Sequence, residues 1–332
     1  MATTSQDKKK SGSDPVPGSE AEKPQDVPAR GWLQIAKRGW AEAKTDQVPL
    51  LAAGVAFYAF LAIFPAMIAL VFIYGLVADP ATITNQVGQL TQALPAAAQT
   101  LITDQLTTLA GNNSGAGIGA LVSVLLALFS ASGGVSNLMT AISTAYDEEE
   151  TRSFIKKRAL ALLLTVGAIV FMVIMLALVA AMPIVLQLFD NGFVRFLLQA
   201  ARWVLLVVVI TAALAVLYRV APDRDAPKMR WTSVGAGVAT VLWLVASIGF
   251  SIYAGQGGYQ KTYGALAGIV ILLFWLWITS YAILLGAEIN AESEQQTVAD
   301  TTKGAAEPLG QRGAVKADSV PDGDSPDSDS ES

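Results

Sequence analysis

Long runs of apolar residues alternate with short polar segments along most of this chain. The clearest run, residues 48–78, contains no Asp, Glu, Lys or Arg. A helix needs about 20 mostly apolar residues to cross the hydrocarbon core of a bilayer, and this run is longer. Five more runs share the pattern, so the sequence predicts an all-α, polytopic membrane protein. Its six spans are expected at residues 48–78, 118–141, 159–189, 203–218, 231–254 and 264–287.

The polar segments around these spans differ in character. Residues 30–46 place tryptophans and alanines on one helical face and Lys and Arg away from it. This predicts an amphipathic helix in the membrane interface, with packing on a neighbouring loop as the alternative. Residues 79–116 repeat apolar residues at roughly helical spacing, which predicts a helical loop outside the membrane. The membrane domain should cover residues 30–290, with disordered tails at residues 1–29 and, acidic in character, 291–332.

Basic residues are unequally divided between the two sides of the predicted membrane domain. Segments 30–46, 147–158 and 219–230 each carry four Lys or Arg, whereas residues 79–116 carry none. The other two connections on that second side, residues 190–202 and 255–263, carry two and one basic residues. Because short cytoplasmic loops are enriched in Lys and Arg, the sequence predicts that both termini are cytoplasmic.

Two residue types that support much enzyme chemistry are missing, since the chain has neither cysteine nor histidine. Thiolate metal sites are therefore excluded, and so are the commonest metal ligand and the commonest general base near neutral pH. We expect no enzyme activity, no catalytic residue, no metal site and no cofactor. The acidic C-terminal tail also repels phosphate backbones, so no nucleic acid is expected as a partner.

Two of the predicted spans carry polar residues at every seventh position, which places them on one helical face. These residues are Ser123, Ser130, Asn137 and Thr144 in the second span, and Ser233, Thr240 and Ser247 in the fifth. Each could form an interhelical hydrogen bond, but we interpret the two stripes together as the lining of a polar cavity. Glu288, at the end of the sixth span, is a candidate functional acid, and a carboxylate at the cytoplasmic interface is the simpler interpretation.

Several segments, spread in order along the membrane domain, carry a resemblance to a known family. They are AAGVAFYAFLAIFP (52–65), the Ser130–Gly133 region with AISTAYDEEETRSFIKKR (141–158), YRVAP (218–222), the Tyr259 to Gly264 approach to the last span, and GAEINAE (286–292). Together they resemble the YihY/BrkB family of bacterial inner-membrane proteins. The resemblance implies six helices in a bacterial cytoplasmic membrane. It implies no settled activity, because the family has carried ribonuclease BN and virulence-factor labels and suggested transport roles.

The two stripes, the kink expected at Pro65 in the first span and the glycine-rich turns favour a cavity between helices. We therefore predict a protein that binds or transports a lipid or amphiphilic solute. A non-transporting membrane scaffold is the alternative. A ribonuclease is disfavoured, because without histidine its metal would need fixed carboxylates that this sequence does not scaffold. The expected partners are membrane lipids and one unidentified solute or lipid, and the sequence carries no sign of an oligomeric state.

Overall fold

A computed structural model describes residues 16–75, 116–187, 189, 191–256 and 266–321. Regular structure in these ranges is helical, apart from one isolated bridge between Pro227 and Thr302. The elements are a 3-10 turn (Pro24–Asp26), α1 (Ala29–Thr45), α2 (Val48–Gly75), α5 (Ala116–Ala145), α6 (Phe154–Gln187), α7 (Gly192–Val220), α8 (Met229–Gln256) and α10 (Ala267–Gln295). The predicted outer loop, residues 79–116, lies outside the described residues except for its last position.

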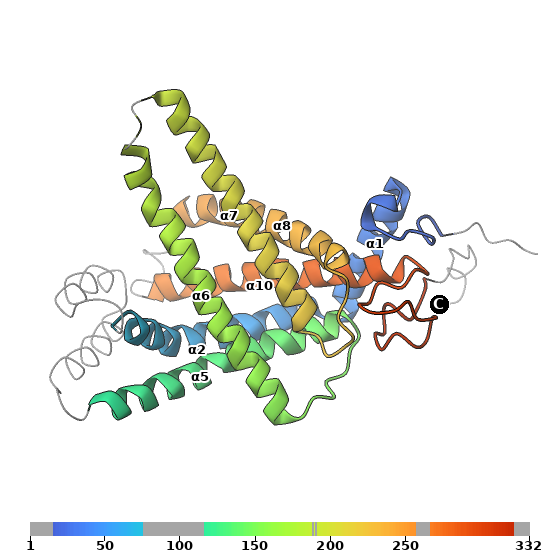
Figure 1. The fold of residues 1–332 in the computed structure, drawn as a ribbon, viewed down its shortest axis with the longest axis horizontal. Helices are drawn as coiled ribbons and strands as arrows, with labels where there is room; N and C mark the ends of the chain where they lie inside the picture. The colour runs from blue at the N-terminus through green and yellow to red at the C-terminus, as the bar shows by residue number, and fades with distance from the viewer. Residues whose placement is uncertain (1–15, 76–115, 188, 190, 257–265, 322–332) are drawn as a thin grey trace, which may run out of the picture.

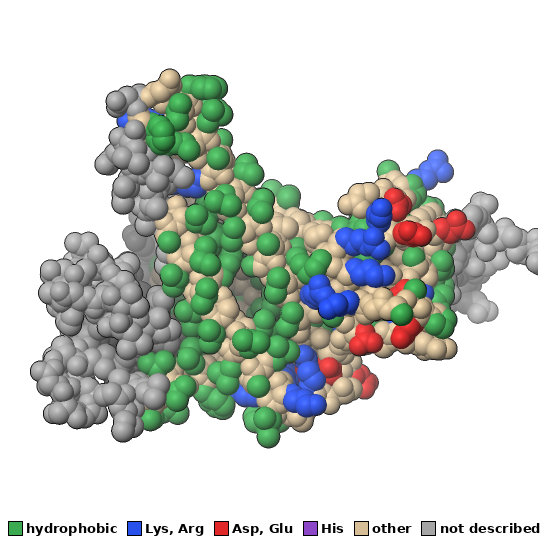
Figure 2. Space-filling model, in the orientation of Figure 1, with side chains coloured by type: hydrophobic (Ala, Val, Ile, Leu, Met, Phe, Trp, Pro, Cys, Tyr) green, Lys and Arg blue, Asp and Glu red, His purple; other side chains and the backbone are tan. Residues whose placement is uncertain are grey.

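Five of these helices are long and apolar enough to cross a membrane, and a sixth span results if α1 and α2 are counted as one bent span. Figure 2 shows hydrophobic side chains over the middle of the molecule and most charged side chains at the end near α1 and the C-terminal segment. The prediction of an all-helical, polytopic membrane protein is confirmed by the helical structure and by the number of candidate spans.

Helix α10 holds the bundle together, packing on α8, α2 and α1, while α2 also packs on α5 (Figure 1). Met139, Ile142, Tyr146, Tyr218 and Leu284 are fully buried where these helices meet. Helices α6 and α7 form a hairpin that extends away from the rest, and α6 crosses α5 (Figure 1). Much of the α6 surface is exposed apolar side chain, which suits contact with lipid.

Helix α1 coincides with the predicted amphipathic helix and turns by 66° into α2. The turn uses Gln47, whose φ of 53° lies in the left-handed region. Ile35 is fully buried, and a Cβ on Gly39 would lie 3.2 Å from Ile289 of α10, whereas Leu33 and Trp40 are exposed. The helix therefore packs one face on α10 and leaves Leu33 and Trp40 exposed, while Trp32 packs against the cluster around Ile35.

The structure corrects the prediction of disorder for residues 16–29 and 291–321. Helix α10 continues to Gln295, and Glu292 and Glu294 are fully buried in its last turns. The Val298 amide donates to the Ser19 carbonyl at 2.8 Å, so the two tails pack on each other. Composition suggests disorder when charges are solvated, but here the charges are buried with partners of opposite sign.

Candidate functional site

The two predicted polar stripes are not brought together. In Figure 1, α10 runs between α8 and the α2–α5 pair, so α10 separates α5 from α8. Ser130 and Ser233 are exposed, and no side chain is described for Ser123. The Asn137 amide donates to the Gly133 carbonyl of its own helix at 2.9 Å, so it is satisfied locally. The polar lining of one shared cavity is therefore not found among the described residues.

The remaining members of the stripes also form local contacts. Thr144 donates to the Thr140 carbonyl one turn earlier. Thr240 is buried, and its hydroxyl accepts a hydrogen bond from Thr211 of α7 at 3.1 Å, as expected of an interhelical contact. The Ser247 hydroxyl is buried with no hydrogen-bond partner among the described residues.

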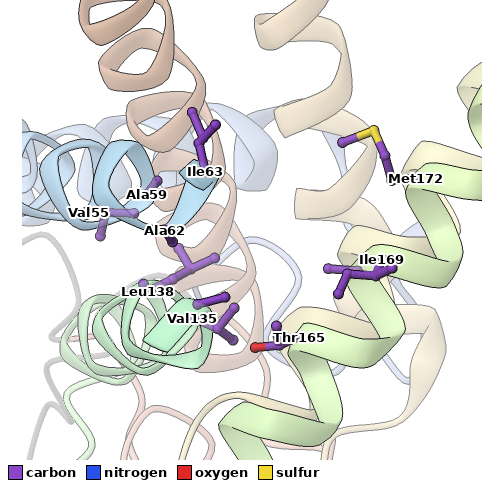
Figure 3. A pocket seen from close by; sticks show the side chains of 12 residues that line it. Val55, Ala59, Ala62, Ile63, Val135, Leu138, Thr165, Ile169 and Met172 are labelled. Carbon is purple, nitrogen blue, oxygen red and sulfur yellow. The ribbon is translucent and has the colours of Figure 1, made fainter. Parts of the chain in front are cut away.

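A different cavity, of about 440 Å³, lies between α2, α5 and α6 (Figure 3). Its lining consists of Val55, Ala59, Ala62 and Ile63 of α2, Ala131, Gly134, Val135 and Leu138 of α5, and Thr165, Ala168, Ile169 and Met172 of α6. The single hydroxyl in that lining, on Thr165, donates to the Ala161 carbonyl of its own helix at 2.7 Å. The cavity is therefore apolar and suited to hydrocarbon rather than to an ion or a sugar.

Small residues explain why a cavity forms at this position. A Cβ on Gly134 would lie 3.2 Å from both Ala62 and the Tyr58 carbonyl, so α2 and α5 approach closely there. Helix α6 packs across α5 and contributes Thr165 and Ala168 to the cavity lining. Their side chains are too short to fill the space between the three helices. The sequence signal was the excess of Ala and Gly on these helices, which indicates close packing but not which faces meet.

The cytoplasmic end predicted from the basic loops contains a dense cluster of charges. The Lys316 ammonium lies 2.9 Å from Glu292, 3.0 Å from Asp147 and 3.5 Å from Glu42. On the other side of Glu292, Arg38 donates to its carboxylate at 2.6 Å. Four segments of the chain thus meet at this carboxylate cluster, and Lys316 is its central cation.

Glu288, the candidate functional acid, lies beside this cluster. Its side chain is 1% exposed, and neither carboxylate oxygen has a hydrogen-bond partner among the described residues. Its Cβ faces Gly39 of α1, so it points into a helix contact and not into open solvent. The interpretation as a carboxylate at the interface does not fit this burial, and the functional role of Glu288 stays a prediction.

Comparison with known proteins identifies the family. The sequence profile of the Virulence factor BrkB family matches residues 40–309, which is most of the chain. This chain belongs to the BrkB family. The YihY/BrkB resemblance seen in the sequence is therefore confirmed, and it extends beyond the spans into the folded C-terminal segment.

Individual relatives of this BrkB-family protein carry two kinds of description, ribonuclease-like and membrane protein. It is 31% identical over 246 residues to YfkH of Bacillus subtilis, described as ribonuclease-like, covering 72% of this chain and 87% of YfkH. A UPF0761 membrane protein of Tolumonas auensis is 40% identical over 91 residues, which cover 26% of this chain and 29% of the relative. A UPF0761 membrane protein of Chromobacterium violaceum is 43% identical over 82 residues, which cover 24% of this chain and 19% of the relative. No solved structure gives a significant match.

The ribonuclease-like description belongs to YfkH. Within the described ranges of this BrkB-family chain, no group of three or more acidic residues is arranged to hold a metal ion. Two of its buried carboxylates are instead paired with cations, Glu292 with Arg38 and Lys316 and Glu294 with Arg224. The expectation that the chain is not an enzyme stays a prediction.

The turn between α1 and α2 gives this BrkB-family protein a pH dependence. Burial, together with the charges of Asp147 and Glu42, raises the pKa of the Asp46 carboxyl to about 6 against the opposing effect of Lys316. Between about pH 4 and 6 the folded protein then binds the proton that the unfolded chain releases, so stability falls as the pH rises through this window. We expect Asp46→Asn to raise the melting temperature at about pH 8 and to have little effect at about pH 4.5.

Glu149→Gln is the matched control, because it removes one negative charge from an exposed loop side chain. It should leave the melting temperature close to wild type at both pH values. A melting temperature of Asp46→Asn that equals or falls below wild type at about pH 8 would contradict the assignment.

Proposed function

We propose that this protein binds the hydrocarbon chain of a lipid or amphiphilic solute in the cavity between α2, α5 and α6 and moves it within the membrane. The observation that carries the proposal is an apolar cavity of about 440 Å³ formed by three helices of a membrane protein. Ligand cavities typically measure about 300 to 1,000 Å³ and are lined mainly by apolar side chains. The alternative, a non-transporting scaffold, does not require such a cavity.

We also propose that the protein lies in the bacterial cytoplasmic membrane with both termini in the cytoplasm. The two basic loops and the C-terminal segment meet at one end, since Asp223 accepts hydrogen bonds from Thr151 and Val315 donates to Glu148. Because basic loops are retained in the cytoplasm, that end is the cytoplasmic one. In intact cells, a membrane-impermeant thiol reagent should label Ser114→Cys and not Ser328→Cys, and the reverse pattern would contradict this orientation.

Filling the cavity should remove the bound hydrocarbon chain. Ala168 is one of the cavity-lining residues, whereas Val170, two residues later on the α6 surface, is outside that lining. We expect Ala168→Trp to lower the amount of lipid that stays bound through detergent washing by about tenfold, because its indole would occupy the cavity. Val170→Trp adds the same side chain to the lipid-facing surface and should retain wild-type lipid. Native mass spectrometry of the purified proteins measures both.

Transport is tested separately from binding. Wild-type protein in vesicles should accelerate movement of a fluorescent lipid between leaflets, and Ala168→Trp should not. Binding without any acceleration would favour the scaffold. Equal lipid retention by Ala168→Trp, Val170→Trp and wild type would show that this cavity is not the lipid-binding site.

A further inference from the structure

The guanidinium of Arg158 lies in an unusual position for a basic residue near the start of a membrane helix. Its guanidinium carbon lies 3.9 Å from the centre of the Phe129 ring, and Nη2 donates to the Phe129 carbonyl. Phe129 lies near the middle of α5, whose residues run from 116 to 145. The guanidinium is therefore held beside the middle of a spanning helix instead of at its cytoplasmic end.

The neighbouring Lys157 shows what the ordinary arrangement looks like. Its ammonium pairs with Glu150 at 3.1 Å and donates to the Thr140 hydroxyl close to the cytoplasmic end of α5. Arg158 forms no ion pair with any carboxylate in the described ranges, and its Nε is buried without a hydrogen-bond partner. A cation within the membrane part of a protein is costly unless an anion compensates it. The described protein supplies only a carbonyl and an aromatic ring to Arg158.

Arg158 also lies at one end of the apolar cavity. On α6 it precedes the cavity residues Thr165 and Ile169 by two and three turns, which places all three on one helical face. On α5, a Cβ on Gly133 would lie 3.9 Å from Nη1, and the next residue, Gly134, lines the cavity. The guanidinium therefore lies against the part of α5 that lines the cavity.

We propose that Arg158 binds the anionic group, a phosphate or a carboxylate, of an amphiphile whose hydrocarbon chain occupies the cavity between α2, α5 and α6. The inference rests on the proposed function and specifies its ligand as an anionic amphiphile. Guanidinium groups bind phosphate and carboxylate through paired N–H donors, and Nε with one terminal nitrogen forms such a pair. The apolar lining would contact the hydrocarbon chain of the ligand, and the unpaired guanidinium would bind its anionic group.

Binding of four amphiphiles with matched chains tests the proposal on the purified full-length protein. We expect phosphatidylglycerol or a free fatty acid to bind at least about tenfold more tightly than diacylglycerol or phosphatidylcholine. Arg158→Gln should remove this preference and leave diacylglycerol binding unchanged, and Arg158→Lys should restore part of it. Lys156→Gln removes an exposed charge from the same turn and should behave as wild type. The stronger of the two anionic ligands identifies phosphate or carboxylate as the recognised group.

The Arg158→Gln variant is expected to fold, because the Ser132 hydroxyl also donates to the Phe129 carbonyl, at 2.7 Å, and keeps that acceptor satisfied. Its melting temperature and elution volume verify this. If diacylglycerol and phosphatidylglycerol bind equally and Arg158→Gln alters neither, the assignment of Arg158 is overturned while the cavity proposal stands. If none of the four binds, or if Ala168→Trp binds them as wild type does, the proposed function fails as well.

Discussion

Gly286→Ala is expected to lower the free energy of unfolding by about 3 kcal/mol, a large effect for the addition of one methyl group. At this position α10 crosses α8 at backbone contact. A Cβ on Gly286 would lie 2.6 Å from the Gly235 carbonyl, from the Tyr218 hydroxyl and from Ala239. The Tyr218 hydroxyl is itself fixed, because it donates to the Ile283 carbonyl at 2.6 Å. The helices must therefore separate along the main contact of the bundle, and the melting temperature should fall by about 10 °C.

Gly237→Ala is the matched control on the partner helix. A Cβ on Gly237 would meet no atom within 4 Å, so alanine there adds helix propensity without a clash. Its melting temperature should equal or slightly exceed that of wild type. Equal melting temperatures for Gly286→Ala and Gly237→Ala would show that the α8–α10 crossing is not as close as described.

Lys316→Met is expected to destabilise the C-terminal segment by about 3 to 5 kcal/mol, because it removes the cation shared by three carboxylates. Burial works against its charge, but Glu292 and Asp147 raise the pKa of Lys316 well above its usual value. A raised pKa keeps this contribution in place at all pH values below the ordinary lysine pKa, so the effect should be undiminished near neutral pH. The buried Glu292 carboxylate would then face those of Glu42 and Asp147, which are partly exposed, without the cation between them.

Hydrogen exchange measures the effect of Lys316→Met directly. Amides around Arg312, whose side chain donates to the carbonyls of Val298 and Ala317, should exchange much faster in the variant. Lys303→Met, which removes an exposed lysine from the same segment, should leave exchange unchanged. Unchanged protection in Lys316→Met would mean that apolar packing, and not the ion cluster, holds this segment.

Much of the membrane domain can be predicted from residue patterns along the sequence. Charge-free runs locate the helices, because an apolar helix of that length is stable only in a bilayer or a large core. The family follows from short segments such as GAEINAE (286–292), in which Gly286 and Asn290 form the α8–α10 contact. Asn290 joins α10 to α8 by accepting from the Gly235 amide and donating to the Thr232 carbonyl.

The candidate site could not be predicted in the same way. A period of seven identifies a face of one helix, but it does not identify which neighbour that face meets. Asn137 and Thr240 were therefore predicted to line one cavity, although Asn137 bonds within its own helix and Thr240 bonds to α7. The depth of Arg158 depends on how α6 crosses α5, which is a tertiary property. The order of the C-terminal segment likewise depends on which carboxylates surround Lys316, and these come from three other segments of the chain.

The central claim is that the cavity between α2, α5 and α6 holds a hydrocarbon chain. A cryo-electron microscopy map of the full-length protein in phosphatidylglycerol nanodiscs tests it most directly. The account predicts continuous elongated density between Val55, Val135 and Ile169, ending beside the Arg158 guanidinium. Helices α2, α5 and α6 packed together with no density between them would contradict it.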